Sequence, residues 1–187
     1  MYYENLKFTK DDLEVLTFEN AEFFNCSFDN IYFNKINFSN TSFENCIFQS
    51  CHLNSCNFTD TRLLEVTFNN TELTSILFST LNKFIVEIEF KESFLKYCDF
   101  GKLNLSNTNF LNSTLRECIF FDTNLEKSKF TNSNLYKSTF ENCNLERCDF
   151  VGAIKYRINP TTNKIKNAKF SLPEIVGLLE DFHIKIT

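Results

Sequence analysis

The 187-residue sequence lacks the features on which most enzymes and membrane proteins depend. Its three glycines form no phosphate-binding loop. Its two histidines, His52 and His183, form no recognisable set with nucleophilic or acidic residues, so we expect no catalytic site, no metal site and no cofactor. No apolar run reaches the length of about 18 residues that spans a membrane, and residues 1–5 do not resemble a signal peptide. These absences predict a cytoplasmic protein that is not an enzyme.

The sequence is instead rich in phenylalanine, with 24 residues placed at a nearly constant interval of five. A large apolar residue, Phe or Leu, stands at every fifth position from Phe18 to Phe78 and again from Phe90 to Phe150, and we call it the centre of its unit. The residue two places before each centre is mostly Cys, Ser, Thr or Ala, and the other three are mostly polar. This period fits neither an α-helix nor an ordinary strand. It predicts stacked repeats with a filled interior, so function must come from the surface.

Units such as Cys56-Asn57-Phe58-Thr59-Asp60 and Ser133-Asn134-Leu135-Tyr136-Lys137 resemble the motif of the pentapeptide-repeat family. The resemblance covers about residues 11–155. It implies an all-β solenoid, the right-handed quadrilateral β-helix, in which four units make one square coil. An independent check comes from labelling four faces a to d from Leu13, because phenylalanines then fill faces b and d while leucines fill a and c from the third coil onward. Residues 20 apart should stack at the strand spacing of about 4.8 Å.

The repeat is interrupted once, in the segment 79–89. We expect Ile85 to serve as the face-c centre of this irregular unit, which leaves two extra residues in a bulge or short loop within 79–84. Two interpretations remain open. Either the coil tolerates the extra residues as a packing defect, or they form a protrusion that contacts a partner through Lys83 and Phe84.

All eight cysteines occupy the small inward position, where they alternate with Ser, Thr and Ala. A requirement for small volume predicts this alternation, and a free cysteine behaves as a small buried apolar residue. The sequence contains no Cys-x-x-Cys motif. We therefore expect reduced, structural thiols rather than disulfides or zinc ligands.

Both ends of an open solenoid expose unpaired strand edges, which need a cap. We assign residues 1–12 to an N-terminal cap, 13–155 to the repeat and 156–187 to a C-terminal module. In that module Ser171-Leu172-Pro173-Glu174 predicts the start of a short α-helix that caps the rod. An apolar stripe at helical spacing follows, and two alternating isoleucines predict a final strand. The stripe and the strand comprise Ile175, Leu178, Leu179, Phe182, Ile184 and Ile186.

This C-terminal module resembles that of the Qnr and MfpA-like branch of the pentapeptide-repeat family. There the segment joins two rods end to end, so the resemblance implies a homodimer formed through the six residues above. Proteins of this branch bind type II topoisomerases, DNA gyrase and topoisomerase IV, and protect them from quinolones or toxins. Their rod is similar to a DNA duplex in width and negative charge. The resemblance therefore implies a DNA mimic for resistance or immunity that itself contacts neither nucleic acid nor membrane.

The net charge of −5 is concentrated toward one end of the chain. Residues 1–78 hold 11 acidic and 4 basic residues, whereas residues 151–187 hold 3 acidic and 6 basic ones. The acidic part offers a negative surface to a basic partner, or it serves only to keep the rod in solution. The carboxylates that we expect to bind a partner are Glu14, Glu19, Glu22, Asp29, Glu44, Asp60, Glu65 and Glu72.

A second hypothesis is a structural or scaffolding rod with an unrelated protein partner. The sequence departs from Qnr because it lacks a long inserted loop, and the two extra residues near Phe84 are a much smaller insertion. A shared fold does not confer a shared function. A continuous negative stripe along the rod would favour the mimic, whereas a scaffold needs no such stripe.

Overall fold

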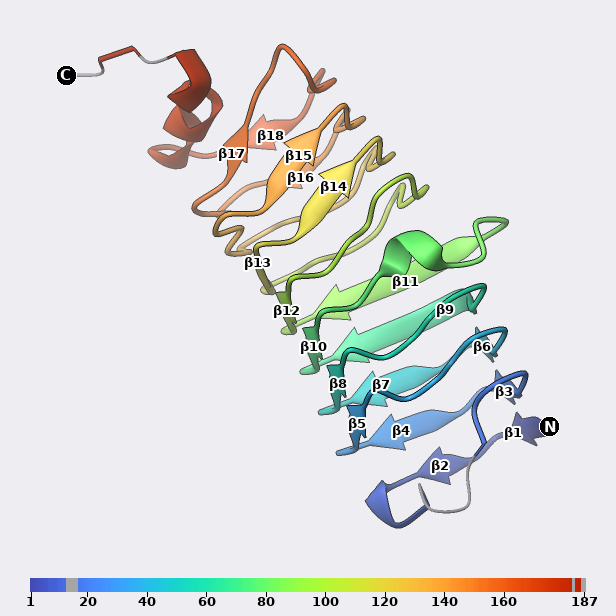
Figure 1. Cartoon of the computed structure of the whole chain (residues 1–187). Coiled ribbons are helices and arrows are strands. Elements are labelled where there is room, and N and C mark those ends of the chain that lie inside the picture. Colours follow the sequence, from blue (N-terminus) through green and yellow to red (C-terminus); the bar gives the residue numbers. More distant parts are fainter. Residues whose placement is uncertain (13–16, 183, 186–187) are drawn as a thin grey trace.

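The structure is a computed structural model that describes residues 1–12, 17–182 and 184–185. It forms a rod of stacked coils with the two chain termini at opposite ends (Figure 1). About eight turns of chain pair in parallel, which confirms the predicted all-β solenoid, a right-handed quadrilateral β-helix. Two of the predicted site residues, Glu14 and Ile186, lie outside the described residues.

The strands are short, and up to the interruption each pairs with the strand 20 residues later. They are β1 (Tyr2–Glu4), β2 (Lys7–Phe8), β3 (Glu22–Phe24), β4 (Ser27–Asp29), β5 (Tyr32–Asn34), β6 (Ser42–Glu44), β7 (Ile47–Gln49), β8 (His52–Asn54), β9 (Arg62–Asn69), β10 (Glu72–Thr74), β11 (Val86–Lys91), β12 (Phe94–Lys96), β13 (Thr114–Arg116), β14 (Ile119–Phe121), β15 (Thr139–Glu141), β16 (Asp149–Phe150), β17 (Arg157–Ile158) and β18 (Lys169–Phe170). The described residues also form the 3₁₀ helices η1 (Lys10–Asp12), η2 (Phe78–Thr80), η3 (Glu174–Leu178) and η4 (Glu180–Phe182).

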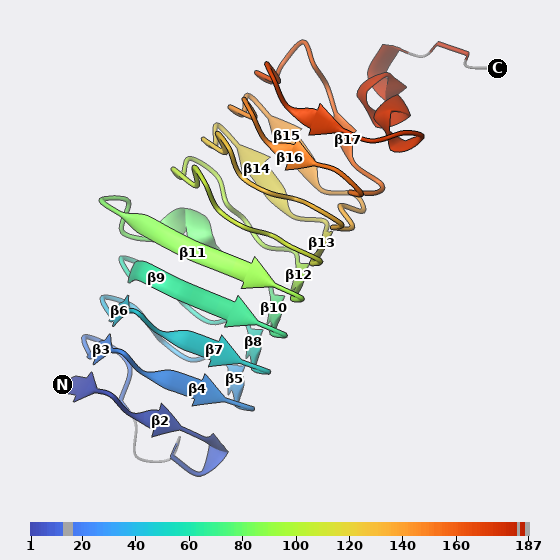
Figure 2. The ribbon, with the colours of Figure 1, turned by 180° about the vertical axis from the view of Figure 1, so that it is seen from behind.

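The strands line four faces of the rod, in the arrangement that the sequence predicts. Face a carries β5, β8, β10, β12 and β13, and face b carries β14, β15 and β17. Face c carries β1, β3, β6 and the first part of β9. Face d carries β2, β4, β7, the second part of β9, β11, β16 and β18, and Figure 2 shows its strands following one another along the rod.

The corners between faces depend on backbone with positive φ, two places after each centre. In the part of the chain that the structure describes, 27 residues other than glycine have this conformation, and 12 of them are asparagine, which tolerates it better than most residues. The backbone N–H of Asn25 donates to the carbonyl oxygen of Glu44 in the next coil at 2.9 Å, and the Asn45 side chain donates to that of Asn25 at 3.1 Å. Because hydrogen bonds between coils hold each corner in this way, even Lys35 and Tyr97 adopt a positive φ.

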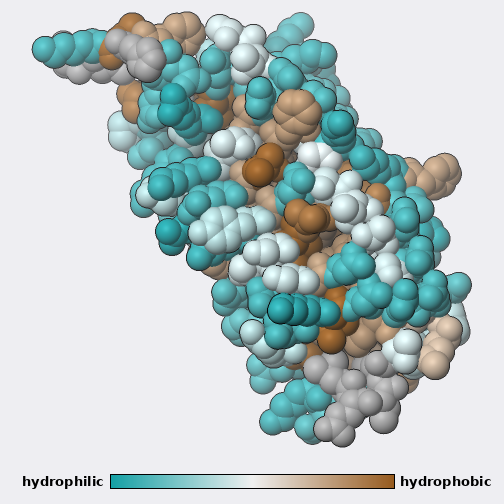
Figure 3. Space-filling view, in the orientation of Figure 1, coloured by the Kyte–Doolittle hydropathy of each residue, from teal (hydrophilic) through white to brown (hydrophobic). Residues whose placement is uncertain are grey.

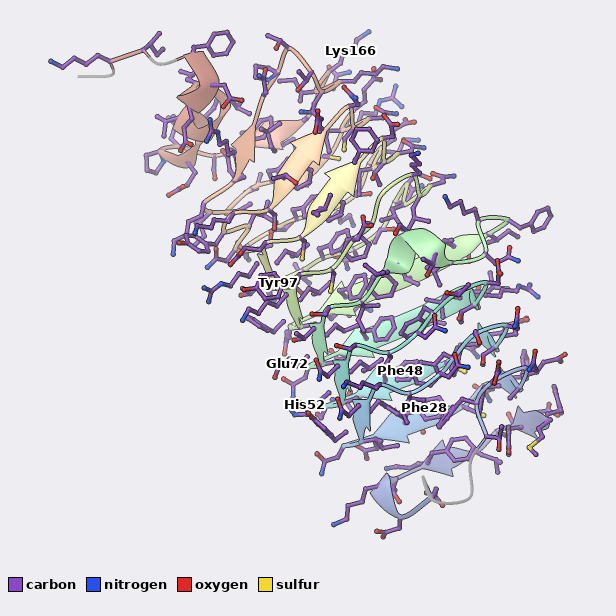
Figure 4. All side chains as sticks on the ribbon, viewed as in Figure 1. Phe28, Phe48, His52, Glu72, Tyr97 and Lys166 are labelled. Carbon is purple, nitrogen blue, oxygen red and sulfur yellow. The ribbon has the colours of Figure 1, made fainter. Side chains whose placement is uncertain are left out.

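The interior is filled by the centres, which stack in columns along the rod. Phe28 and Phe48 lie one above the other inside it, with ring centroids 4.7 Å apart and nearly parallel planes (Figure 4). Neighbouring columns meet edge to face, as between Phe120 and Phe130 at 6.1 Å and 89°. Both geometries are favourable for aromatic pairs. The core is therefore a continuous aromatic stack.

Most of the small inward residues also donate a hydrogen bond to a carbonyl oxygen of the preceding coil, which we call the coil below. The Thr41 hydroxyl donates to the carbonyl oxygen of Phe18 at 2.6 Å, and the Cys46 thiol donates to that of Phe23 at 3.4 Å. All eight cysteines are free and buried, as predicted. Burial raises the pKa of the Cys46 and Cys148 thiols to about 12, so they stay protonated.

The interruption is resolved differently from the prediction that Ile85 is the face-c centre. Val86 pairs with Leu63 and packs against the core, whereas Ile85 is exposed. Leu81 occupies the position of the small inward residue in this unit. Between Leu81 and Val86 the chain has three residues more than a regular unit, and they form a protruding loop. One residue fewer than usual separates Val86 from Phe90, so this coil has no positive-φ residue at its c–d corner. The net excess of two residues thus results from an insertion of three residues before Val86 and a deletion of one residue after it.

The solenoid extends beyond both boundaries expected from the sequence. At the N-terminal end β1 pairs with β3 and β2 pairs with β4, so residues 2–8 already form part of a coil. At the C-terminal end β16 pairs with β18, which continues the stack to Phe170. The first and last coils thus belong to the same repeat as the middle of the rod.

The α-helix predicted after Ser171 is not formed. Its residues fold as the two 3₁₀ helices η3 and η4, which pack at the end of the rod beside β17. A Cβ atom on Gly177 would lie 2.3 Å from the backbone oxygen of Tyr156, so the segment approaches the last coil too closely for any other residue. Ile184 is not in a strand, and the predicted final strand is absent from the residues that the structure describes.

Candidate interaction surface

The candidate functional features of the described residues all lie on the outer surface of the rod, because the Phe and Leu centres of the units fill its interior. Among the described residues there is no cluster of His, Cys, Asp and Glu side chains that could hold a metal ion. Figure 3 shows one face, on which polar side chains surround small apolar spots. None of the helices in the described part of the chain is long and apolar enough to cross a membrane.

The predicted carboxylates do not form a single stripe. Their side chains lie on all four faces, with Glu22, Glu44 and Glu65 on face c, Glu19 and Asp60 on face b, Asp29 on face d and Glu72 on face a. Three of them are paired with bases, as Lys7–Asp29 at 2.8 Å, Arg62–Glu44 at 3.9 Å and His52–Glu72 at 3.1 Å. His52 and Glu72 lie together along one edge of the rod (Figure 4).

The loop between Leu81 and Val86 carries Lys83 and Phe84 at its tip. Phe84 is 90% exposed, more than any other large apolar side chain in the described chain, and its N–H donates to the Asn82 side chain at 3.1 Å. The missing corner residue next to this loop leaves a hollow of about 610 Å³, which we call the notch. Glu65 and Glu87 line it. The deletion gives no signal in the sequence, because nothing marks which of two adjacent apolar residues faces inward.

The C-terminal module presents an apolar surface at the end of the rod. Of the six residues predicted to form a dimer contact, Leu178 packs against the core, and four are exposed: Ile175, Leu179, Phe182 and Ile184. Leu172 and Val176, which the sequence pattern did not single out, are exposed beside them. Arg157 holds the module to the last coil, since its Nε donates to the Asp181 carboxylate at 2.7 Å.

Face a has a different character in the C-terminal half. The side chains of Arg116, Lys137 and Lys155 lie over the ring of Tyr136 at 5.4 to 5.6 Å, and Lys96 lies over Tyr97. Sequence reasoning missed this cluster because the cations come from three different coils. It makes one surface of the rod basic and aromatic, whereas the N-terminal half is acidic.

These features define a parallel β-solenoid with a solid interior and a surface suited to macromolecular contact. Family models described as pentapeptide repeats (8 copies) match residues 21–60 and 36–74, and one described as a pentapeptide repeat region matches residues 93–170. The matches span well over half of the sequence, and the chain belongs to the pentapeptide-repeat family.

Solved structures share this fold over the whole chain. A trypsin-treated variant of QnrB1, a plasmid-mediated fluoroquinolone resistance protein, is 15% identical with a TM-score of 0.65, covering 100% of this chain and 98% of QnrB1. Full-length QnrB1 is 14% identical with a TM-score of 0.53, covering 98% and 97%. HetL from the cyanobacterium Nostoc, involved in heterocyst differentiation regulation, is 12% identical with a TM-score of 0.45, covering 90% and 82%. No curated protein sequence matches the chain significantly.

Proposed function

We propose that the rod is not an enzyme but binds a type II topoisomerase, DNA gyrase or topoisomerase IV, in place of duplex DNA. The observation that carries this proposal is the match in fold to QnrB1, a fluoroquinolone resistance protein, over nearly the full length of both chains. Occupation of the DNA-binding surface would protect the enzyme from quinolones or from a toxin. Since these enzymes act on the chromosome, the protein would work in the cytoplasm.

The acidic N-terminal half supports binding to a basic, DNA-binding surface. A topoisomerase neutralises phosphates with Lys and Arg side chains, and carboxylates on a rod of similar width would meet the same side chains. The carboxylates best able to do so form no ion pair within the described chain: Glu19, Glu22, Asp60 and Glu65. Asp29, Glu44 and Glu72 would first have to leave their paired bases.

The apolar surface of the C-terminal module supports the predicted homodimer. Ile175, Leu179, Phe182 and Ile184 are all exposed on one small module. A two-fold axis at this end would bury the same patch from both copies. The dimer would double the length of the rod and present two acidic halves pointing outward.

A gyrase supercoiling assay with and without ciprofloxacin tests this proposal. We expect the protein either to inhibit supercoiling or to restore it in the presence of the drug at micromolar concentration. The variant Glu19→Gln, Glu22→Gln, Asp60→Asn should lose this effect. The matched control, Glu92→Gln, Asp122→Asn, Glu141→Gln, removes the same charge from the C-terminal half and should keep it. No effect of the unmodified protein on gyrase or topoisomerase IV would eliminate the proposal.

A scaffold with an unrelated protein partner is the second candidate, and the basic surface on face a favours it. The cations around Tyr136 have no evident use in a mimic of DNA, since they would repel the basic surface of a topoisomerase. Replacement of Lys137 and Lys155 by Gln separates the two candidates. A topoisomerase-binding rod should bind equally well or better, whereas a scaffold that uses this face should lose its partner.

A further inference from the structure

The notch beside the 82–85 loop is a consequence of the deleted corner residue. In neighbouring coils the c–d corner carries Asn45, Glu65 and Asn107, one above another, but the coil between Glu65 and Asn107 passes directly from Val86 to Ile88 through Glu87. At this corner the backbone of residues 86–88 therefore extends less far outward than the corners of the neighbouring coils. Residues of four successive coils line the hollow of about 610 Å³ that results.

The coils are also not bonded to one another across the notch. Elsewhere on face c the backbone forms a ladder, as from Leu105 N–H to the Asn124 oxygen at 2.7 Å and from Asn107 N–H to the Glu126 oxygen at 2.9 Å. In the described structure no backbone hydrogen bond or β-bridge joins residues 84–88 to residues 103–107. Backbone N–H and carbonyl groups on the two walls are thus left without partners in the facing coil, and the carbonyl oxygens are available as acceptors.

The charged groups in the notch are mostly acceptors too. Glu65 and Glu87 line it, and neither forms an ion pair within the described residues. Glu89 is paired with Lys91 at 2.6 Å. Lys83 is the one cation among the lining residues, and it belongs to the exposed loop. Two unpaired carboxylates beside free carbonyl oxygens match a guanidinium group, which has five donors and no acceptor.

An apolar surface adjoins this acceptor-rich hollow. Phe84 is 90% exposed at the rim, Ile85 is exposed beside it, and Ile88 forms part of the lining. Aromatic side chains, phenylalanine included, are enriched in the buried centre of protein interfaces. The combination of an acidic hollow and an apolar rim fits an arginine flanked by apolar residues.

We propose that the notch is a docking site for an arginine side chain of a protein partner, with Phe84 and Ile85 packing on the apolar residues next to that arginine. Glu65 and Glu87 bind the guanidinium group, and Phe84 supplies the apolar contact. The site follows from the local geometry of this chain alone, so it stands whether or not the partner is a topoisomerase.

Methyl NMR with a defined peptide tests this site on the intact protein. The probe is acetyl-Leu-Arg-Leu amide, and its control is the same peptide with citrulline, which has the shape of arginine without its charge. The arginine peptide should shift the methyl signals of Ile85 and Ile88 in a saturable manner and leave those of Ile47 and Ile119 unchanged. The citrulline peptide should shift none of them.

Variants assign the binding to the notch. Glu65→Gln with Glu87→Gln should weaken the arginine peptide by about three- to tenfold, because both carboxylates that face the guanidinium group lose their charge and both are exposed to solvent. Phe84→Ala should weaken it by about three- to tenfold. The control Glu92→Gln with Glu117→Gln should bind as the unmodified protein does. The proposal fails if Ile88 never shifts, if both peptides bind alike, or if the Glu65 and Glu87 variant binds normally.

Discussion

The aromatic columns should make the middle of the rod sensitive to the loss of one ring. Phe110 is completely buried, and its ring stacks on Phe90 at 5.2 Å and on Phe130 at 4.7 Å. It also meets Phe100 and Phe120 edge to face, both at 6.0 Å. Replacing a buried Phe with Ala costs about 3–5 kcal/mol. With four aromatic neighbours, each pair worth about 0.5–1.5 kcal/mol beyond its buried area, we expect Phe110→Ala near the top of that range.

Phe110→Leu separates the aromatic contribution from the cavity. Leucine fills the same interior position on faces a and c, as Leu105 and Leu115 do, so it leaves only a small void. All four aromatic contacts are lost, and we expect a cost of about 2–3 kcal/mol. Phe121→Ala is the matched control, because this ring lies partly in solvent and its loss should change stability by about 0.5 kcal/mol or less.

Urea unfolding followed by circular dichroism measures these differences, provided that the slope of free energy against urea is unchanged. The expected order of stability is unmodified protein and Phe121→Ala first, then Phe110→Leu, then Phe110→Ala. If Phe110→Ala costs less than about 1 kcal/mol, the neighbouring coils close over the missing ring, and the stacked column is not what holds the rod together.

Three further predictions concern the corners, the thiols and the C-terminal module. Lys35→Asn should raise the free energy of unfolding by about 0.5–1 kcal/mol in urea titrations, because Lys35 has φ of 56° and asparagine adopts this conformation more easily. The stability that the thiols contribute should be constant below the usual thiol pKa of 9.0 and then fall as pH rises toward 12, because Cys46 and Cys148 bind their protons more tightly when folded; unfolding curves that stay unchanged between about pH 9 and pH 11 would contradict this. Leu179→Asp with Phe182→Asp should give a monomer in analytical ultracentrifugation without loss of the β-sheet signal.

The period of five was sufficient to predict stacked repeats, because each centre is large, inward and repeated. The square coil of four units came from the resemblance to the pentapeptide-repeat family, and the distribution of Phe and Leu over four faces agreed with it. The strand registers confirm that residues 20 apart lie over one another, as Phe23 over Phe43 and Phe28 over Phe48. The small inward residues were assigned correctly to the interior. Their hydrogen bonds to the coil below were not foreseen, since a bond between residues 23 apart becomes visible only once the coil is closed.

Two parts of the chain could not be predicted from residue pattern. In the interruption, Ile85 and Val86 are adjacent and equally apolar, so only pairing with Leu63 decides which faces inward. In the C-terminal module, the apolar spacing of three and four suits an α-helix, and only the spacing of three suits a 3₁₀ helix, so the pattern gave no sign of the tighter turn. There the close approach of Gly177 to Tyr156, a tertiary contact, accompanies the tighter turn.

The predicted partner-binding residues illustrate a different limit. Counting charge located the acidic half, but the pairing of Asp29 with Lys7 and of Glu44 with Arg62 depends on which residues share a face. The basic cluster around Tyr136 likewise joins side chains from separate coils. The distribution of charge along the sequence therefore says little about the surface charge of a solenoid, because the coils bring together residues that are about 20 positions apart.

The positive-φ corners have an evolutionary consequence. The same backbone bend recurs with Asn, Ser, Asp, Glu, Lys, Arg and Tyr, since the adjacent layers impose it whatever side chain points outward. Mutation can consequently replace the outward-facing residues of one coil at a time, while the spacing of the coils and the width of the rod stay the same. A protein built in this way can change what it recognises without changing its shape.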